Sequence, residues 1–330
     1  MHRRRGAGRR QAARWRQEAG AEEAPGKESQ EEGVLKKRTP NTDQAIGVIG
    51  LGIMGSAMAA NLAKAGYEVH GYDILPARRA ALKKAGGTPQ ASIAQVARAA
   101  QVLITSLPSA AALHAVAAEL GARGRVVMET STLPIDEKER ARDTLAKKGV
   151  VLLDCPLSGT GAQARAKDLV VYASGDKKAY AKAQAFMPGF SRAHHYLGAF
   201  GNGSRMKFVA NLMVAIHNVS AAEAFVLGMK AGLAPETIYK VQAESAGTSR
   251  MFQVRGPLMV AGKYGEATMK NELWQKDMKI IGEFAASLGV PTPLFNASAA
   301  IYNAAMAQGY GKEDTAAVCA VLEAMARIRR

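Results

Sequence analysis

Residues 46–55 read Ile46-Gly47-Val48-Ile49-Gly50-Leu51-Gly52-Ile53-Met54-Gly55, a short apolar strand followed at once by a G-x-G-x-x-G turn and a helical stretch. In this arrangement Gly50 permits the tight turn, Gly52 lets a pyrophosphate approach the backbone, and Gly55 lets the helix pack closely on the strand. The N–H groups at the helix N-terminus then face the phosphates. The stretch therefore predicts a dinucleotide-binding loop that comprises Gly50, Leu51, Gly52, Ile53, Met54 and Gly55.

A carboxylate closes the second predicted strand, 18 residues after the last loop glycine. This residue, Asp73, is placed to accept hydrogen bonds from both hydroxyls of an adenosine ribose. A carboxylate there would repel a 2′-phosphate, so Asp73 predicts NAD in preference to NADP. Arg78 and Arg79 lie nearby and favour a phosphate, which leaves NADP open.

Short β-branched runs alternate with alanine-rich helical stretches from Ala45 to about Gly203. Helical stretches such as Gly55–Ala65 and Ile135–Lys148 separate most of the runs. This alternation predicts an α/β Rossmann domain, a doubly wound parallel sheet with right-handed crossovers, over residues 44–203. The predicted strands are Ala45–Ile49, Val69–Tyr72, Val102–Ser106, Val126–Glu129, Val150–Asp154 and Leu169–Ala173.

Helical patterns alone continue after Gly203, which predicts a second, all-α domain over residues 204–330. The site is expected between the two domains, at the carboxyl ends of the strands. The predicted helices are 204–231, Pro235–Ser245, Asn271–Ser287 and Thr315–Ile328.

Residues 1–43 lack apolar periodicity and pass from arginine-rich to glutamate-rich sequence. They are predicted to be a disordered basic tail. A targeting segment or a wrongly assigned start site stays open.

Composition narrows the classes of partner. The formal net charge is +16, of which residues 1–45 hold 11 basic and 7 acidic side chains, so most of the excess lies on the body. Such a body attracts small anionic metabolites, and no nucleic-acid-binding motif accompanies the charge. The two cysteines form no metal signature, adjacent His194 and His195 point apart on a strand, and no metal site is expected. No membrane span is expected either, and the predicted location is the cytoplasm.

Four blocks in order carry a resemblance to a known family. They are 50–62 with the glycine loop, 154–159 (Asp-Cys-Pro-Leu-Ser-Gly), 201–211 with the pattern G-x-G-x-x-x-K-x-x-x-N, and 276–278 (Lys-Asp-Met). With these blocks, residues 45–325 resemble the β-hydroxyacid dehydrogenases, the 3-hydroxyisobutyrate dehydrogenase-like oxidoreductases. The resemblance implies that residues 204–330 form a C-terminal domain like that of 6-phosphogluconate dehydrogenase, which serves substrate binding and dimerisation. It also implies a homodimer or homotetramer.

The resemblance also implies roles for individual residues. Lys207 would be the catalytic acid/base, while Ser158, Gly159, Thr160 and Asn211 would bind the substrate. Leu107, Pro108 and Thr132 would line the nicotinamide side of an NAD cofactor, and Lys276 would close over it from the helical domain.

The chemistry of the residues agrees with these roles. Hydride transfer from an alcohol carbon requires that the hydroxyl proton is removed, and a lysine whose pKa is lowered can accept it. Asn211 lies four residues after Lys207 and therefore shares its helix face. The predicted reaction is the reversible oxidation of a small anionic 3-hydroxy acid to the oxo acid or semialdehyde.

The substrate loop departs from the family pattern, because Thr160, Gln163 and Lys167 replace three glycines and Gly161 is added. Gln163, Arg165 and Lys167 add hydrogen-bond donors, which either serve a more polar or dianionic acid or are simply solvated. Three alternatives stay open. They are a glyoxylate or succinic semialdehyde reductase that uses NADPH, an imine reductase, and a non-catalytic cofactor-binding scaffold with a basic arm for nucleic acid. Lys207 argues against the last two.

Overall fold

The computed structural model describes residues 45–121 and 123–330, and the predicted tail, 1–43, lies outside them. Its first part is built on six parallel strands, in the order β3-β2-β1-β4-β5-β6. This is the order of a Rossmann sheet, which reverses between β1 and β4 and places a ligand crevice at their carboxyl ends. The predicted fold class is confirmed. The strands are β1 (Ala45–Ile49), β2 (Glu68–Tyr72), β3 (Thr88–Pro89), β4 (Val102–Thr105), β5 (Val126–Glu129) and β6 (Val151–Asp154).

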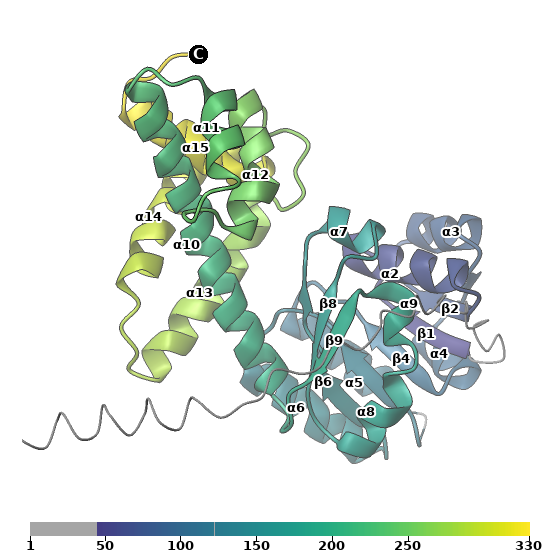
Figure 1. Cartoon of the computed structure of the whole chain (residues 1–330). Coiled ribbons are helices and arrows are strands. Elements are labelled where there is room, and N and C mark those ends of the chain that lie inside the picture. The colour runs from purple at the N-terminus through teal and green to yellow at the C-terminus, as the bar shows by residue number, and fades with distance from the viewer. Residues whose placement is uncertain (1–44, 122) are drawn as a thin grey trace, which may run out of the picture. The chain divides into compact units, whose positions relative to one another are not determined.

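Helices cover both faces of this sheet because its strands are apolar on both sides (Figure 1). On β5, Val127 packs with α4, α5 and α6, whereas Val126 and Met128 pack on the opposite face with α2 and α9. Two faces buried in this way are the normal state of a parallel sheet. The helices are α2 (Ile53–Lys64), α3 (Pro76–Lys84), α4 (Ile93–Ala99), α5 (Ala110–Glu119) and α6 (Ile135–Ala146).

A separate sheet of three strands follows β6, and here one prediction was wrong. The predicted strand Leu169–Ala173 forms as β8 (Val170–Ala173), but it pairs antiparallel with β7 (Leu157–Ser158) and parallel with β9 (Ala193–Tyr196) instead of extending the first sheet. A parallel return needs a crossover of about a dozen or more residues, and the short connection from β7 to β8 holds only α7 (Gly161–Arg165). Helices α8 (Lys177–Ala183) and α9 (Met187–Phe190) lie between β8 and β9.

The second part consists of helices and short 3₁₀ turns, as predicted. Its longest helix, α10, contributes Ala215, Val219, Ala222 and Phe225 to one buried core that also contains side chains of the later helices. The elements are α10 (Asn202–Lys230), α11 (Pro235–Gln242), α12 (Arg250–Ala261), α13 (Asn271–Ser287), α14 (Pro293–Ala307), η1 (Tyr310–Lys312), η2 (Thr315–Ala317) and α15 (Val318–Met325).

By length and composition alone, α10 is apolar enough to cross a membrane. A central core helix passes the same test. Asn211 and Asn218 are both buried and hydrogen-bonded to other helices, so we interpret α10 as the core helix of this part.

Candidate active site

The glycine loop has the shape that a dinucleotide requires. Gly50 adopts a left-handed conformation with φ +90°, and a Cβ there would lie 2.2 Å from the Ser106 carbonyl oxygen. A Cβ on Gly55 would lie 1.9 Å from the Gly50 carbonyl oxygen, so both positions are closed by the fold itself. A Cβ on Gly52 would meet only Arg78 Nη1, at 4.0 Å, and faces open space. The loop is therefore open where a phosphate must approach, at the N-terminus of α2.

The Asp73 carboxylate makes several hydrogen bonds within the protein that the sequence did not indicate. Its Oδ2 accepts a hydrogen bond from the Leu51 amide at 2.8 Å and one from Arg78 Nη1 at 3.2 Å, while Oδ1 accepts from the Leu75 amide at 2.9 Å. Burial raises the pKa of this carboxyl, but these hydrogen bonds and the Arg78 charge outweigh it and lower the pKa. Asp73 thus supports the glycine loop directly, and its choice between NAD and NADP stays a prediction.

The residues expected around the nicotinamide lie at the carboxyl ends of neighbouring strands. Leu107 and Pro108 follow β4, and Thr132 follows β5. The Leu107 amide donates to the Ser131 hydroxyl at 2.8 Å. From α13, Lys276 Nζ donates to the Thr132 carbonyl at 2.5 Å. The structure therefore brings the predicted Lys276 to another predicted cofactor residue.

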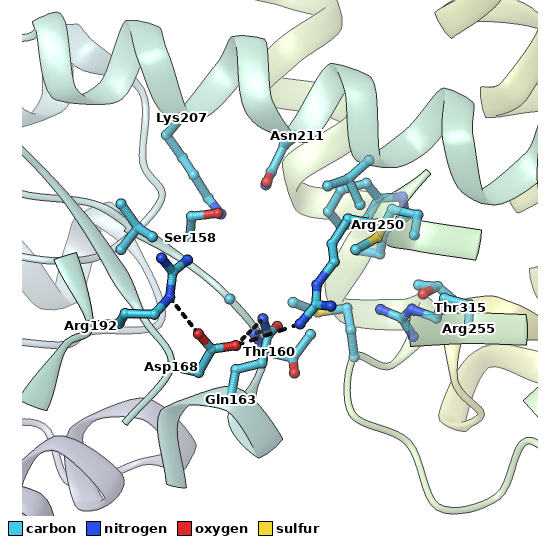
Figure 2. Close-up of a pocket in the computed structure, with 16 residues that line it drawn as sticks. Ser158, Thr160, Gln163, Asp168, Arg192, Lys207, Asn211, Arg250, Arg255 and Thr315 are labelled. Carbon is cyan, nitrogen blue, oxygen red and sulfur yellow. Dashed lines mark hydrogen bonds and ion pairs between the residues drawn. The ribbon is translucent and has the colours of Figure 1, made fainter. Parts of the chain in front are cut away.

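A cavity of about 400 Å³ contains all five residues predicted for catalysis and substrate binding. Figure 2 shows Lys207 and Asn211 projecting into it from α10, with Ser158 and Thr160 from the segment around β7. None of the predicted cofactor residues lines this cavity. Its lining is Ser158, Gly159, Thr160, Gln163, Asp168, Val170, Arg192, Lys207, Asn211, Val214, Arg250, Met251, Arg255, Met269, Trp274 and Thr315.

A buried polar network holds the first turn of α10, one turn before Lys207. Asp154 accepts hydrogen bonds from the Ser204 amide at 2.7 Å and the Ser204 hydroxyl at 2.8 Å. Lys138, which is fully buried, pairs with Asp154 at 2.8 Å and with Glu129 at 2.7 Å. Burial opposes the charge on Lys138, but the two carboxylates outweigh it and raise its pKa. The network fixes α10 to β5 and β6.

Lys207 is buried, and no hydrogen bond to its ammonium group is seen within the described residues. Burial lowers the pKa of Lys207 to about 8, with Asp277 opposing the shift and Lys276 adding to it. Asp277 also accepts a hydrogen bond from Asn211 Nδ2 at 2.9 Å and pairs with Lys276 at 3.1 Å. One N–H of the Asn211 amide is engaged with Asp277, which leaves its second N–H and its oxygen for a substrate.

Sequence reasoning missed four charged residues of the cavity. Arg192 and Asp168 form an ion pair at 2.7 Å across 24 residues of sequence, and no local pattern indicated this pairing. Arg250 and Arg255 lie on α12, a helix that was not predicted. Ser249, whose hydroxyl caps α12 by accepting from the Phe252 amide, was a readable signal for its start.

The three extra donors of the substrate loop, Gln163, Arg165 and Lys167, lie in different environments in the structure. Gln163 lines the cavity and donates to Asp168 at 3.3 Å. Arg165 and Lys167 are exposed and are not part of the lining. Within 45–121 and 123–330, no three His, Cys, Asp or Glu side chains gather as metal ligands.

Two family models divide the chain between them. The NAD binding domain of 6-phosphogluconate dehydrogenase matches residues 45–198. The NAD-binding domain of NADP-dependent 3-hydroxyisobutyrate dehydrogenase matches residues 201–322.

Known proteins match along most of the chain. An L-threonate dehydrogenase of Cupriavidus necator is 34% identical over 83% of this chain and 94% of its own length. A 2-(hydroxymethyl)glutarate dehydrogenase of Eubacterium barkeri is 30% identical over 85% and 95%. The crystal structure of a 3-hydroxyisobutyrate dehydrogenase from Salmonella typhimurium has a TM-score of 0.76 and 28% identity, covering 84% of this chain and 100% of that one. The chain therefore belongs to the β-hydroxyacid dehydrogenase family of NAD(P)-dependent oxidoreductases.

Proposed function

We propose that the chain catalyses the reversible NAD(P)-dependent oxidation of a small 3-hydroxy acid to its oxo acid or semialdehyde, with Lys207 as acid/base. One observation supports this assignment above all. Lys207 is a buried lysine with a pKa lowered to about 8, and it lines one cavity with Ser158, Gly159 and Asn211. An amine that titrates near operating pH is suited to proton transfer at a hydroxyl.

The proposed division of labour follows from the side chains. A nicotinamide cofactor, which the glycine loop, Leu107, Pro108, Thr132 and Lys276 would hold, would supply the hydride acceptor. Lys207 removes the hydroxyl proton in oxidation and returns it in reduction, so each turnover transfers one hydride and one proton. Ser158 and the backbone at Gly159 and Thr160 bind the substrate carboxylate, and Asn211 positions the hydroxyl through its side-chain amide.

The decisive experiment combines a substrate screen with a lysine variant. Hydroxy acids and semialdehydes are assayed with NAD(H) and NADP(H), and Lys207→Ala is tested on the best pair. Positioned proton transfer contributes about 10²- to 10⁴-fold in rate, so kcat should fall by that factor while cofactor affinity, measured by fluorescence quenching, stays the same. Lys207→Arg should not restore activity, because a guanidinium stays protonated.

Lys240 on α11 is exposed and provides a matched control for the loss of a lysine. Lys240→Ala should keep native turnover. Near-native turnover in Lys207→Ala would refute the role of this lysine.

We also propose a homodimer or homotetramer. Met206, Val209 and Met213 are 41%, 57% and 44% exposed and lie on one face of α10, which supports an apolar interface there. Light scattering after size-exclusion chromatography measures the assembly, and a monomer at micromolar concentration would contradict it. The cytoplasmic location stays a prediction that cell fractionation tests.

A further inference from the structure

The wall of the cavity formed by α12 and the β7–β9 segment carries positive charge that the proposed chemistry does not use. Figure 2 shows Arg192 and Arg250 reaching Asp168 from two sides. Arg192 Nε donates to Asp168 at 2.7 Å, whereas Arg250 Nη2 stands 3.9 Å from the other carboxylate oxygen. Asp168 thus pairs with Arg192 and lies near Arg250, whose donors make no hydrogen bond to it; the side chains of Arg192 and Arg250 are 64% and 68% exposed.

The charges of this wall do not balance. Among the described lining residues, Asp168 is the single carboxylate, and it faces two guanidinium groups. The remaining arginine of the lining, Arg255, pairs with Asp314, which lies outside the cavity. The pair of arginines around Asp168 therefore retains an excess of one positive charge, which matches one carboxylate better than a doubly charged phosphate.

A second observation is that the same wall contains a buried donor without a hydrogen-bond partner. Arg255 is 2% exposed, lines the cavity, and its Nε has no hydrogen-bond partner within the described residues. A buried donor without a partner costs free energy unless a ligand or water satisfies it. Arg250 lies five residues earlier on the same helix. The wall thus offers spare donors and spare charge together.

We propose that Arg250, assisted by Arg192, binds a second carboxylate of the substrate, so that the chain acts on 3-hydroxy acids with two carboxylates. The proposal rests on the proposed function, since the first carboxylate and the hydroxyl occupy the Ser158 and Lys207 end. The planar guanidinium of Arg250 can hold a carboxylate through two parallel hydrogen bonds. The cavity, about 400 Å³ in volume, has room for such a molecule with one carboxylate at each end.

Kinetics with two matched substrates test the proposal. Both are 3-hydroxypropionates, and they differ only in carrying a methyl or a carboxyethyl group on carbon 2. The wild type should have the higher kcat/KM for the diacid. Hydrogen bonds to charged groups are strong enough for about a 10- to 100-fold effect, so Arg250→Ala should lower the diacid-to-monoacid ratio of kcat/KM by that factor. Arg250→Lys keeps the charge but loses the two parallel donors of the guanidinium. Its diacid-to-monoacid ratio should therefore lie between those of the wild type and Arg250→Ala.

Arg165 supplies the control, because it lies on α7 in the same substrate loop, is exposed, and does not line the cavity. Arg165→Ala removes the same charge from the protein and should preserve the ratio. If the ratio fell equally in Arg250→Ala and Arg165→Ala, the preference for the diacid would come from general attraction of negative charge and not from a subsite. A wild type that prefers the monoacid would overturn the proposal.

A binding experiment separates this proposal from the proposed function. Glutarate and butyrate are titrated by calorimetry into protein saturated with NAD⁺ or NADP⁺, which requires no turnover. Tighter binding of glutarate, lost in Arg250→Ala, supports the subsite, and equal binding of the two acids overturns it. Glutarate binding without oxidation of either hydroxy acid would refute the proposed function and leave the subsite standing.

Discussion

Lys207 owes its position to two glycines that precede it. Gly201 has φ +91°, a left-handed conformation that favours glycine, directly before α10 begins. A Cβ on Gly203 would lie 2.3 Å from the Tyr172 carbonyl oxygen and 2.7 Å from that of Asp154. Any other residue at 203 would therefore push α10 away from β6 and β8. The glycines of G-x-G-x-x-x-K thus shape the backbone, and the lysine is the residue of this motif that we propose for the chemistry.

The lowered pKa of Lys207 predicts opposite pH profiles for the two reaction directions. Oxidation needs the neutral amine as a base, so its kcat/KM should rise with pH and level off above about 8. Reduction needs the ammonium as an acid, so its kcat/KM should fall above the same pH. Steady-state rates from pH 6 to 10 measure both profiles. Profiles of the same sign in both directions would contradict the assignment.

Neighbouring charges should move that inflection in opposite directions. Asp277→Asn removes a negative charge that raises the pKa of Lys207, so the inflection should shift to lower pH. Lys276→Met removes a positive charge that lowers the pKa, so the inflection should shift to higher pH. A merely structural effect of either variant would lower the rates without moving the inflection.

Cofactor choice depends on Asp73 and its arginine partner. Asp73 accepts from the Leu51 amide within the glycine loop, so Asp73→Ala should weaken binding of both cofactors and narrow a preference for NAD. Arg78→Ala should instead weaken NADP binding more than NAD binding, because the exposed guanidinium faces Gly52. Fluorescence titration of both cofactors checks this. A wild type with a strong preference for NADPH would show that Arg78 outweighs Asp73.

At the scale of elements, the buried charges beneath α10 predict a large stability effect. Lys138→Met would leave Glu129 and Asp154 buried without their cation, and breaking such a pair costs about 3–5 kcal/mol. Urea denaturation should show a loss of that size in the free energy of unfolding. Lys147, exposed at the end of α6, gives the control Lys147→Met with little change. A loss below about 1 kcal/mol for Lys138→Met would mean that these charges are solvated.

Sequence patterns predicted the elements whose signals are local. The alternation of apolar runs and helices indicated the Rossmann sheet, and the motif around Lys207 indicated the start of α10 to within two residues. The sequence patterns missed two helices, α12 and α14, whose local signals are misleading or weak. Gly256 and Pro257 read as helix breakers, yet α12 continues through them to Ala261. The alanines of α14 give little contrast between its faces, so no apolar stripe marked it.

The same difference between local signals and tertiary packing explains which site residues the sequence predicted. The residues quoted from motifs lie around one cavity and one sheet edge, because most of these motifs lie at the end of a strand or near the start of a helix. Arg192, Asp168 and Arg250 come from three separate segments of the chain, and only tertiary packing brings the two arginines within 4 Å of the Asp168 carboxylate. Asp277 stood in a quoted block, but its contact with Asn211 spans 66 residues of sequence. Pairing across such separations is invisible to periodicity and composition.

At the scale of the whole molecule, the excess of positive charge is shared between the described body and residues 1–43. Every residue proposed here for cofactor, substrate or proton transfer lies between Gly50 and Asp277. The site should therefore work without the first 43 residues, although their arginines add to the total charge of +16. Long-range attraction of an anionic substrate is screened beyond about 8 Å at physiological salt, so the local arginines should dominate.

Deleting residues 1–43 is the test at this scale. Turnover, cofactor affinity and melting temperature should all stay within experimental error of the full chain, because the described cores and the cavity are built from later residues. Nucleic-acid binding by both forms, measured at several salt concentrations, is the matching control for the alternative of a scaffold with a basic arm. A lower melting temperature or weaker cofactor binding in the shortened chain would show that residues 1–43 contribute to the fold or the site. Salt-sensitive nucleic-acid binding lost on deletion, together with no turnover of any hydroxy acid by the full chain, would favour the scaffold over the enzyme.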